Sequence, residues 1–172
     1  MSDLTPTLLF PPSLSPLRSE RLVLRAMEDA DAVALLELYG DPLVMRYTDE
    51  LPFADLEMVA LMLASVRRLL ATGESLEWAV VVHGGQLIGT CGLHSFDPAQ
   101  RTAEVGCLLK PAAWGRGYMA EAIGLLTGFA KDVLRLERLT ADVAVENERA
   151  QRLFKKLGYT AGPSGMLSID LG

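Results

Sequence analysis

The sequence predicts a single α/β domain with a mixed, mostly antiparallel central sheet and helices on both faces of that sheet. Three observations predict this fold class. The chain has 172 residues, of which 50% are hydrophobic; its middle holds three strand-like segments joined by short turns; and its last third alternates helical and strand-like segments. This length suits one domain that buries about 70% of its unfolded surface. An antiparallel meander that runs into a β-α-β crossover gives a mixed sheet.

The first seventy residues are expected to form one strand and two helices. Polar and apolar residues alternate over Arg21–Met27, which predicts a strand. Acidic residues then favour the start of a helix, which should cover Asp29–Tyr39. Apolar residues three and four positions apart predict a second helix over Pro52–Ala71.

The rest of the chain supplies the meander and the crossover. A Gly-Gly turn and an Asp-Pro turn separate the three meander strands, and a glycine-bearing loop opens the crossover helix, which should end near Val133. The complete order is β-α-α-β-β-β-α-β-α-β-β. The remaining predicted elements are strands at Trp78–Val82, Leu87–Phe96, Thr102–Leu109 and Leu139–Val145, a helix at Asn147–Leu157, and two short strands near Tyr159 and over Met166–Leu171.

The N-terminus contains four prolines in sixteen residues. We predict a loose arm over residues 1–16, whose apolar Leu-Leu-Phe run could still pack on the domain, and a single domain over residues 17–172. Asp3 stands where a secretory signal peptide has basic residues, so we predict a cytoplasmic protein. Two cysteines are too few for a disulfide scaffold or a four-thiolate zinc site, and we predict no metal site.

The charges are unevenly distributed. The net charge is −6, with 16 basic and 22 acidic side chains. Residues 1–100 carry 6 basic and 14 acidic side chains, whereas residues 101–160 carry 10 and 7. This pattern suggests an anionic ligand on the later segment and a cationic partner on the earlier one, although solvated charges can also fall this way by chance. An acidic chain without a long apolar run is a poor candidate for nucleic-acid or membrane binding.

The strongest chemical signal is the sequence WGRGYMAEA at Trp114–Ala122, which follows a strand and opens a helix. Its two glycines permit close approach of the backbone to a ligand, and no proline removes an N–H donor there. The first turn of a helix has unpaired N–H groups and a dipole that favour an anion, to which Arg116 adds a full charge. A diphosphate fits these features. The alternative is a glycine-softened loop with an exposed arginine.

Two kinds of diphosphate ligand are compatible with this loop. Gly115, Gly117 and Ala120 match the spacing of the dinucleotide-binding fingerprint. That fingerprint requires glycines directly after a parallel strand, whereas five residues intervene here and the incoming strand belongs to an antiparallel meander. The acidic residue expected about twenty positions later is also poorly placed, since Glu137 precedes the next strand.

Five segments together resemble the GNAT superfamily of acyl-CoA-dependent N-acyltransferases, in the subgroup that contains the ribosomal-protein N-terminal acetyltransferases. They occur in family order over residues 17–160, and this order is more specific than any one segment. At Trp114 and Met119 the loop departs from the core pattern of the superfamily. The matching segments are SERLVLR (Ser19–Arg25), GTCGL (Gly89–Leu93), AEVGCLL (Ala103–Leu109), WGRGYMAEA (Trp114–Ala122) and NERAQRLFKKLGY (Asn147–Tyr159).

The resemblance implies acetyl-CoA as the acyl donor. Its diphosphate would lie on the loop backbone, and its pantetheine arm would enter a gap between the strands at residues 103–109 and 139–145. Asn147 would reach that arm, although its place at a helix start is also explained by capping alone. Arg152 supplies charge suited to a 3′-phosphate or simply a solvated helix face. The expected donor-binding residues are Leu108, Leu109, Trp114, Gly115, Arg116, Gly117, Tyr118, Met119, Ala120, Asn147 and Arg152.

Acyl transfer to an amine requires a neutral nucleophile. At pH 7, deprotonation costs about 1 kcal/mol for an α-amine but roughly 4–5 kcal/mol for a lysine side chain. Glu104 is the candidate base; the alternative is a surface carboxylate paired with a nearby arginine. His94 should face Glu104 if residue numbers paired across the two strands sum to 198, and Cys91 should then face Cys107 on the other side of the sheet. A bulge near Gly106 would disrupt the second pair.

The expected general acid is missing from both places where relatives carry one. Phe154 stands at the usual tyrosine and Ala150 at the serine that some relatives have; Tyr118, Tyr159 or water could substitute. We expect the two N-terminal helices and Tyr47 to wall the acceptor site, with His94 as a further acceptor contact.

Three functions therefore remain at this stage. The first is acetyl transfer to a primary amine, either the α-amino group of a protein N-terminus or a small molecule, by a monomer or homodimer. The others are a catalytically inactive acyl-CoA sensor of the same fold and a dinucleotide-binding module.

Overall fold

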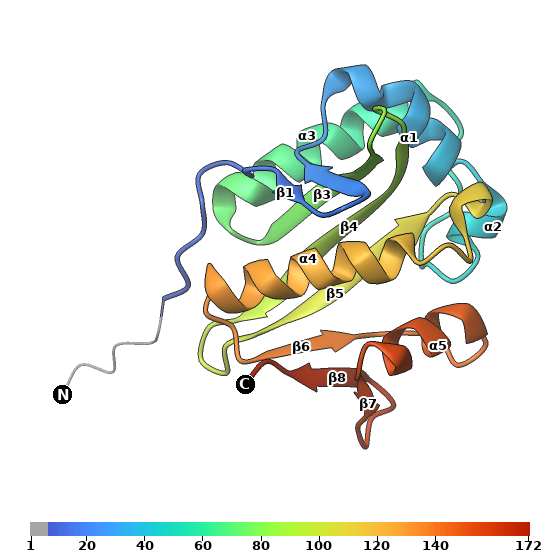
Figure 1. Ribbon diagram of the computed structural model, residues 1–172. Coiled ribbons are helices and arrows are strands. Elements are labelled where there is room, and N and C mark those ends of the chain that lie inside the picture. Colours follow the sequence, from blue (N-terminus) through green and yellow to red (C-terminus); the bar gives the residue numbers. More distant parts are fainter. Residues whose placement is uncertain (1–6) are drawn as a thin grey trace.

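The computed structural model describes residues 7–172 and contains one eight-stranded sheet with the order β1-β2-β3-β4-β5-β6-β8-β7 (Figure 1). Only β5 and β6 pair in parallel, so the sheet is mixed and mostly antiparallel, as the sequence predicts. The strands are β1 (Leu17–Arg18), β2 (Leu22–Arg25), β3 (Ser75–Val82), β4 (Leu87–Asp97), β5 (Thr102–Leu109), β6 (Arg138–Ala141), β7 (Thr160–Ala161) and β8 (Leu167–Asp170).

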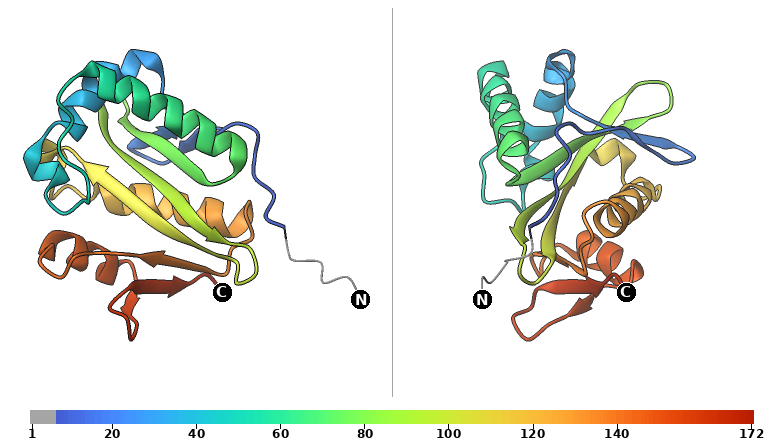
Figure 2. Two further views of the ribbon diagram at one scale, coloured as in Figure 1. Left: turned by 180° about the vertical axis from the view of Figure 1, so that it is seen from behind. Right: turned by 90° about the vertical axis from the view of Figure 1, so that its left-hand side faces the viewer.

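Helices cover both faces of the sheet (Figure 2). Helices α1 and α3 lie on one face, where Leu35 and Val59 pack on Ala79 of β3. Helix α4 lies on the other face, where Ile123 and Leu126 enter the larger core. The helices are α1 (Ala32–Tyr39), α2 (Pro42–Met45), α3 (Leu56–Thr72), α4 (Tyr118–Asp132) and α5 (Glu148–Lys156), with short 3-10 turns at Asp29–Asp31 and Pro111–Ala113.

The N-terminal arm is not loose over the part that the structure describes. Residues 1–6 of the predicted arm lie outside the described residues. Leu8 is buried in the larger core, and the Phe10 ring stands edge-on to Phe96 with centroids 4.8 Å apart. Two residues of the Leu-Leu-Phe run, Leu8 and Phe10, therefore pack on the domain, whereas Leu9 is exposed. Burial of these two apolar side chains outweighs the cost of ordering a proline-rich segment.

Several predicted boundaries shift for local reasons. The second helix begins at Leu56 instead of Pro52, because the Asp55 side chain accepts a hydrogen bond from the Met58 N–H and caps it there. Between the two long helices, Asp41 caps the short helix α2, which the sequence analysis does not anticipate. The strand predicted at Trp78 begins three residues earlier, so Glu77 belongs to β3.

The pairing of β4 with β5 has the predicted register. Cys91 pairs with Cys107 and His94 with Glu104, so both predicted pairs are confirmed. Cys91 is buried in the core beside α4, whereas His94 lies on the opposite face. The irregularity in this ladder falls between His94 and Asp97 and not near Gly106.

Strands β5 and β6 separate soon after they meet. Their parallel pairing covers only Thr102–Glu104 against Arg138–Thr140. The strand predicted over Leu139–Val145 ends at Ala141, because the chain turns away from the sheet there. Among the described residues, the second half of β5 therefore has no strand partner on the β6 side. Its backbone groups along this edge can form hydrogen bonds with a ligand.

A buried ion pair fixes the junction between β2 and α1. Nη1 and Nη2 of Arg25 each donate a hydrogen bond of 2.8 Å to the Asp31 carboxylate, and the Glu28 N–H donates to the same carboxylate. Burial alone would raise the pKa of Asp31, but these hydrogen bonds hold it below its usual value. This junction orients α1, whose last residue, Tyr39, lines the site described below.

We predict that Asp31→Asn lowers the free energy of unfolding by about 1–2 kcal/mol at pH 7, because one side of a partly buried charge pair is lost. A lowered carboxyl pKa stabilises the fold above the usual carboxyl range, and the benefit disappears as pH falls through the folded-state pKa. Urea unfolding of both proteins between pH 7 and pH 3 should show the difference shrinking. Asp29→Asn, which affects an exposed pair with Arg67, is the matched control; an equal loss in the control would contradict the prediction.

Candidate active site

A cavity of about 890 Å³ opens where β5 and β6 separate. Successive β5 residues point to opposite faces of the sheet, yet Glu104 through Leu109 all line the cavity. The cavity therefore passes from one face to the other through the gap. Its other walls come from the end of α1, the α2 segment, the loop before α4, the chain after β6, and α5.

The loop before α4 presents backbone donors to this cavity. Gly115 and Gly117 have φ values of 75° and 77°, a left-handed conformation that other residues adopt at a cost. Gly117 caps α4, and Glu121 donates the first backbone hydrogen bond of the helix, to the Gly117 carbonyl. Among the described residues, the N–H groups from Gly115 to Ala120 have no backbone acceptor, so they are available to hold an anion.

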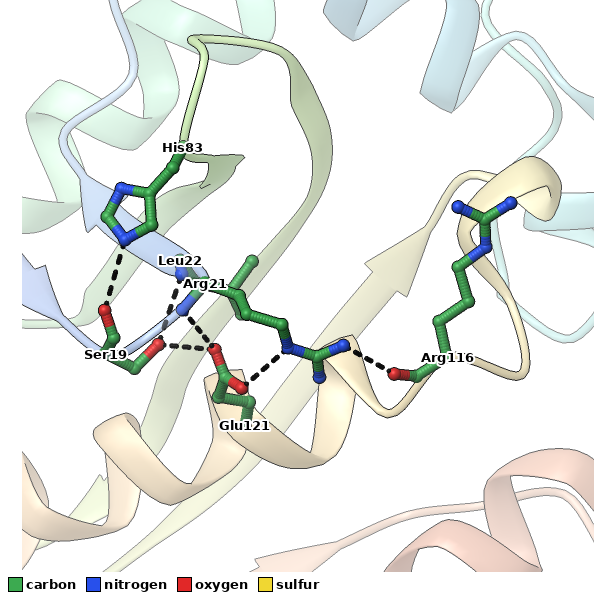
Figure 3. Close-up of polar contacts among 6 residues, drawn as sticks. All are labelled: Ser19, Arg21, Leu22, His83, Arg116 and Glu121. Carbon is green, nitrogen blue, oxygen red and sulfur yellow. Dashed lines mark hydrogen bonds and ion pairs between the residues drawn. The ribbon is translucent and has the colours of Figure 1, made fainter.

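A clamp from the turn between β1 and β2 holds this loop in place (Figure 3). Glu121 accepts hydrogen bonds from the Ser19 hydroxyl at 2.6 Å and from the Arg21 Nε at 3.0 Å. Arg21 also donates to the Arg116 carbonyl at 2.9 Å, and its guanidinium lies over the Tyr118 ring. Burial alone would raise the pKa of Glu121, but the bonds from Ser19 and Arg21 hold it below its usual value. This clamp is not predicted from the sequence, because Ser19 and Arg21 lie about 100 residues before Glu121 in the chain.

Helix α5 adds positive charge to the same end of the cavity. Arg149, Arg152 and Lys156 line it. The Arg149 guanidinium lies 3.2 Å above the centroid of the Trp114 ring, and the indole N–H of Trp114 donates to the Leu109 carbonyl at 2.9 Å. Burial lowers the pKa of Arg149, which remains a cation at neutral pH.

Thirteen of the fourteen site residues predicted from the sequence line the cavity. Arg116 is the exception: it borders a smaller hollow with Lys110 and Tyr118. Asn147 caps α5 by accepting the Ala150 N–H at 3.2 Å while it lines the cavity. The residues that line the cavity are Tyr47, His94, Glu104, Leu108, Leu109, Trp114, Gly115, Gly117, Tyr118, Met119, Ala120, Asn147 and Arg152.

The departures from the superfamily pattern have structural explanations. Met119 is buried in the core while it borders the cavity, so its apolar side chain is held by packing. Phe154 is buried at the cavity wall and stands edge-on to Tyr159 with centroids 4.9 Å apart. Burial raises the pKa of Tyr159, whose hydroxyl is buried without a hydrogen-bond partner and does not line the cavity. Tyr159 is therefore poorly placed to act as the general acid.

The end of the cavity beside α1 and α2 contains groups that the sequence analysis does not nominate. The Tyr39 hydroxyl and the Thr90 hydroxyl share a hydrogen bond of 3.0 Å. Beside them, burial raises the pKa of Glu77 to about 7, and a hydrogen bond from the Ser75 side chain opposes part of that rise. Asp49 and Glu50 add carboxylates from the segment after α2. A carboxylate within a strand is the sequence signal that could have identified Glu77. This signal appears only when β3 is known to begin at Ser75.

Comparisons with known proteins agree with this geometry. The acetyltransferase (GNAT) domain family matches residues 21–160. The chain belongs to the GNAT acetyltransferases. It is 33% identical over 144 residues to the uncharacterized N-acetyltransferase p20 of Bacillus licheniformis, covering 83% of this chain and 81% of that protein. It is 29% identical over 138 residues to the spermidine N(1)-acetyltransferase of Escherichia coli K12, covering 80% and 72%.

Solved structures share the fold. The spermidine N-acetyltransferase of Vibrio cholerae in complex with CoA and spermine superposes with a TM-score of 0.78 at 21% identity, over 89% of this chain and 97% of that one. The GNAT protein described here is thus an acyl-CoA-dependent N-acetyltransferase that uses acetyl-CoA. The dinucleotide-binding hypothesis is wrong, because the strand that enters the loop is antiparallel to β4 and a 3-10 turn precedes the glycines.

Two further structural findings concern the described residues, 7–172. None of their helices is long and apolar enough to cross a membrane. None of their His, Cys, Asp and Glu side chains gather in a group of three or more that could hold a metal ion.

We predict that Gly117→Ala weakens acetyl-CoA binding about tenfold, because a side chain at φ 77° is strained and its Cβ would lie 3.4 Å from Arg21 Nη2. Arg116→Ala should weaken binding less than about threefold, because main-chain donors provide most of the anion site. Isothermal titration with acetyl-CoA measures both. A larger loss for Arg116→Ala than for Gly117→Ala would contradict this account of the loop.

We also predict that Arg21→Ala weakens acetyl-CoA binding about threefold to tenfold, because the loop must then be ordered by the ligand itself. The thermal shift on adding acetyl-CoA should fall accordingly. Arg138→Ala breaks a comparable exposed ion pair, with Asp170, away from the loop and serves as the control. An unchanged shift in Arg21→Ala would mean that the loop holds its conformation without the clamp.

Proposed function

We propose that this GNAT enzyme transfers the acetyl group of acetyl-CoA to a primary amine on a positively charged acceptor in the cytoplasm. The acceptor is the α-amino group of a protein N-terminus or a small-molecule amine that carries additional positive charge. The observation that carries the proposal is the division of charge in the cavity. The carboxylates on the cavity wall come from the sheet and the segment after α2, apart from Asp142 on the chain after β6, whereas the cations come from α5.

The charge division matches the two substrates. An anionic diphosphate is attracted to the free N–H groups of the loop and to Arg149 and Arg152, while a cation is attracted to the other end. Asp49 and Glu50 border that end, and Glu77 and Glu104 lie deeper in it. Two of the relatives described above are named for spermidine, a polycationic amine, which supports a cationic acceptor.

The donor-binding role follows the same elements. We assign the diphosphate to the backbone from Gly115 to Ala120 and the pantetheine arm to the gap between β5 and β6. Leu108 and Leu109 lie on the open half of β5, where backbone groups without a strand partner can pair with amide groups of the arm. Asn147 borders this gap from α5.

The acceptor-binding role falls to Tyr47, His94 and Glu104. The Tyr47 hydroxyl donates to the Glu146 carbonyl at 3.2 Å, which joins the α2 segment to the chain before α5 across the mouth of the cavity. Glu104 faces the cavity beside His94, where its carboxylate can contact the ammonium group of the acceptor. Phe154 cannot donate a proton, and a thiolate with pKa near ~8.5 leaves without obligatory help from an acid.

A thiol-release assay with a panel of amines tests the proposal. We expect kcat/KM for an amine with a second positive charge to exceed that for a singly charged amine of equal length by at least about tenfold, and the advantage to fall with added salt. The panel should include spermidine, peptides with free N-termini and basic second residues, and simple monoamines. Equal kcat/KM values for doubly and singly charged amines would contradict the proposal that the acceptor carries additional positive charge.

The source of the preference is tested by Glu50→Gln. We expect it to raise KM for the doubly charged amine about threefold to tenfold while KM for a monoamine changes little. Glu57→Gln removes an exposed carboxylate from the first turn of α3, outside the cavity, and is the matched control. A similar effect of both variants would indicate a general field of the acidic surface instead of the cavity carboxylates.

A further inference from the structure

Three residues on neighbouring strands form a row at the acceptor end of the cavity. Glu77 of β3 pairs with Gly92 of β4, and Gly92 pairs with Gly106 of β5. Directly paired residues point to the same face of the sheet, so the only side chain in this row belongs to Glu77. The two glycines leave a bare strip of backbone that leads from Glu77 to the open edge of β5.

The Glu77 side chain lies along this strip. A Cβ built on Gly92 would come within 2.5 Å of the Glu77 Cδ and 2.6 Å of its Oε1, so the carboxyl group occupies the space above Gly92. The strip continues above Gly106, where, among the described residues, a Cβ would meet only the His94 ring, with Nε2 at 3.5 Å. A small group can therefore sit over Gly106, one strand spacing of about 4.8 Å from Gly92.

Within residues 7–172, no ion pair involves the Glu77 carboxyl group. Its pKa of about 7 reflects burial, opposed by the Ser75 hydrogen bond. Of the neighbouring elements, α1 contributes Tyr39, which bonds to Thr90, and β2 contributes Arg25, which is paired with Asp31. The other titratable groups facing this end, from β4, β5 and the segment after α2, are His94, Glu104, Asp49 and Glu50, and the Cys91 and Cys107 thiols lie nearby on the opposite face of the sheet.

We propose that Glu77 accepts the proton of the acceptor amine, which binds over Gly106 between the Glu77 carboxylate and the gap that holds the thioester. This inference rests on the proposed function. A protonated amine gives one proton to Glu77, and its nitrogen then forms a bond to the thioester carbonyl carbon. The carbon–sulfur bond breaks, and the leaving thiolate takes the second proton from nitrogen. The products are the amide and the free thiol, and Glu77 returns its proton to solvent.

The geometry favours Glu77 over Glu104 for this step. Glu104 lies on β5 itself and pairs with His94, two residues along the strand from Gly106. From there it can hold the charge of the acceptor, whereas Glu77 faces the open strip that an amine over Gly106 would border. A base is most effective when its pKa is close to the working pH, and a carboxyl group with a pKa of about 7 meets this condition.

Kinetics across pH test the proposal, after thiol release by the wild-type protein has established an accepted amine. In the wild-type protein, kcat/KM for that amine should fall below about pH 7 as Glu77 becomes protonated. Glu77→Gln should lower kcat/KM about 10²-fold or more at pH 8 and abolish this acid limb, while thermal stabilisation by acetyl-CoA persists. Glu74→Gln, which changes a nearby exposed carboxylate bonded to Thr72, should behave like wild type.

Two comparisons separate a base from a structural residue. Ser75→Ala removes a hydrogen bond that stabilises the Glu77 carboxylate, so the acid limb should move to higher pH, which a purely structural role would not produce. Glu104→Gln should raise the KM of the amine and keep the acid limb. Loss of the limb in Glu104→Gln, with Glu77→Gln within about threefold of wild type, would overturn the proposal and make Glu104 the base.

Gly106→Ala provides a test that does not depend on the folding of Glu77→Gln. The added methyl group would stand 3.5 Å from His94 Nε2, an ordinary contact, so the fold should tolerate it. We expect kcat/KM for the amine to fall about tenfold or more with acetyl-CoA affinity within about threefold of wild type. Unchanged amine kinetics would mean that the acceptor does not cross this strip, and the proposal would be wrong. A wild-type protein that releases no thiol with any amine would instead refute the proposed function.

Discussion

The active site depends on the early end of one strand pairing. After three paired residues, β6 turns away, and within the described part of the chain the second half of β5 has no strand partner on this side. Buried N–H and C=O groups need partners, so this edge suits a ligand with amide groups of its own. The separation also joins the two faces of the sheet, which lets a donor held beside α4 and α5 reach an acceptor held beside α1 and α2. Neither substrate site would communicate with the other if β5 and β6 stayed paired.

Glycines have two different roles around this opening. At Gly115 and Gly117 they permit the positive φ values of the loop that we propose binds the diphosphate, and the Arg21–Glu121 ion pair holds the start of α4 against the turn before β2. At Gly92 and Gly106 the backbone is extended, and the useful property is the missing side chain. The space above Gly92 lets a long carboxylate from β3 lie across β4, so that a residue two strands away reaches toward the edge of β5.

Charge is divided along the same path. In the proposed arrangement, the cations of α5 and the loop donors would face the diphosphate, whereas carboxylates from the sheet and the segment after α2 would face the amine. The expected role of each carboxylate depends on its depth in the cavity. Asp49 and Glu50 at the rim would attract a cation, whereas Glu77, which lies above Gly92, can change its protonation near neutral pH.

The sequence by itself determined the order of the elements apart from β1 and α2, the exact range of β5, and the register that pairs His94 with Glu104, because hydrophobic periodicity and turn residues are local. Motif spacing also located the glycine-bearing loop that opens α4. The sequence misplaced boundaries where a cap or an early turn decided them, as at Asp55 and Ala141. The tertiary structure alone decided the packing of Leu8 and Phe10, the Arg21–Glu121 clamp and the environment of Glu77. The clamp and the glycine strip join residues far apart in the chain, and desolvation depends on everything packed around a group, which no local pattern records.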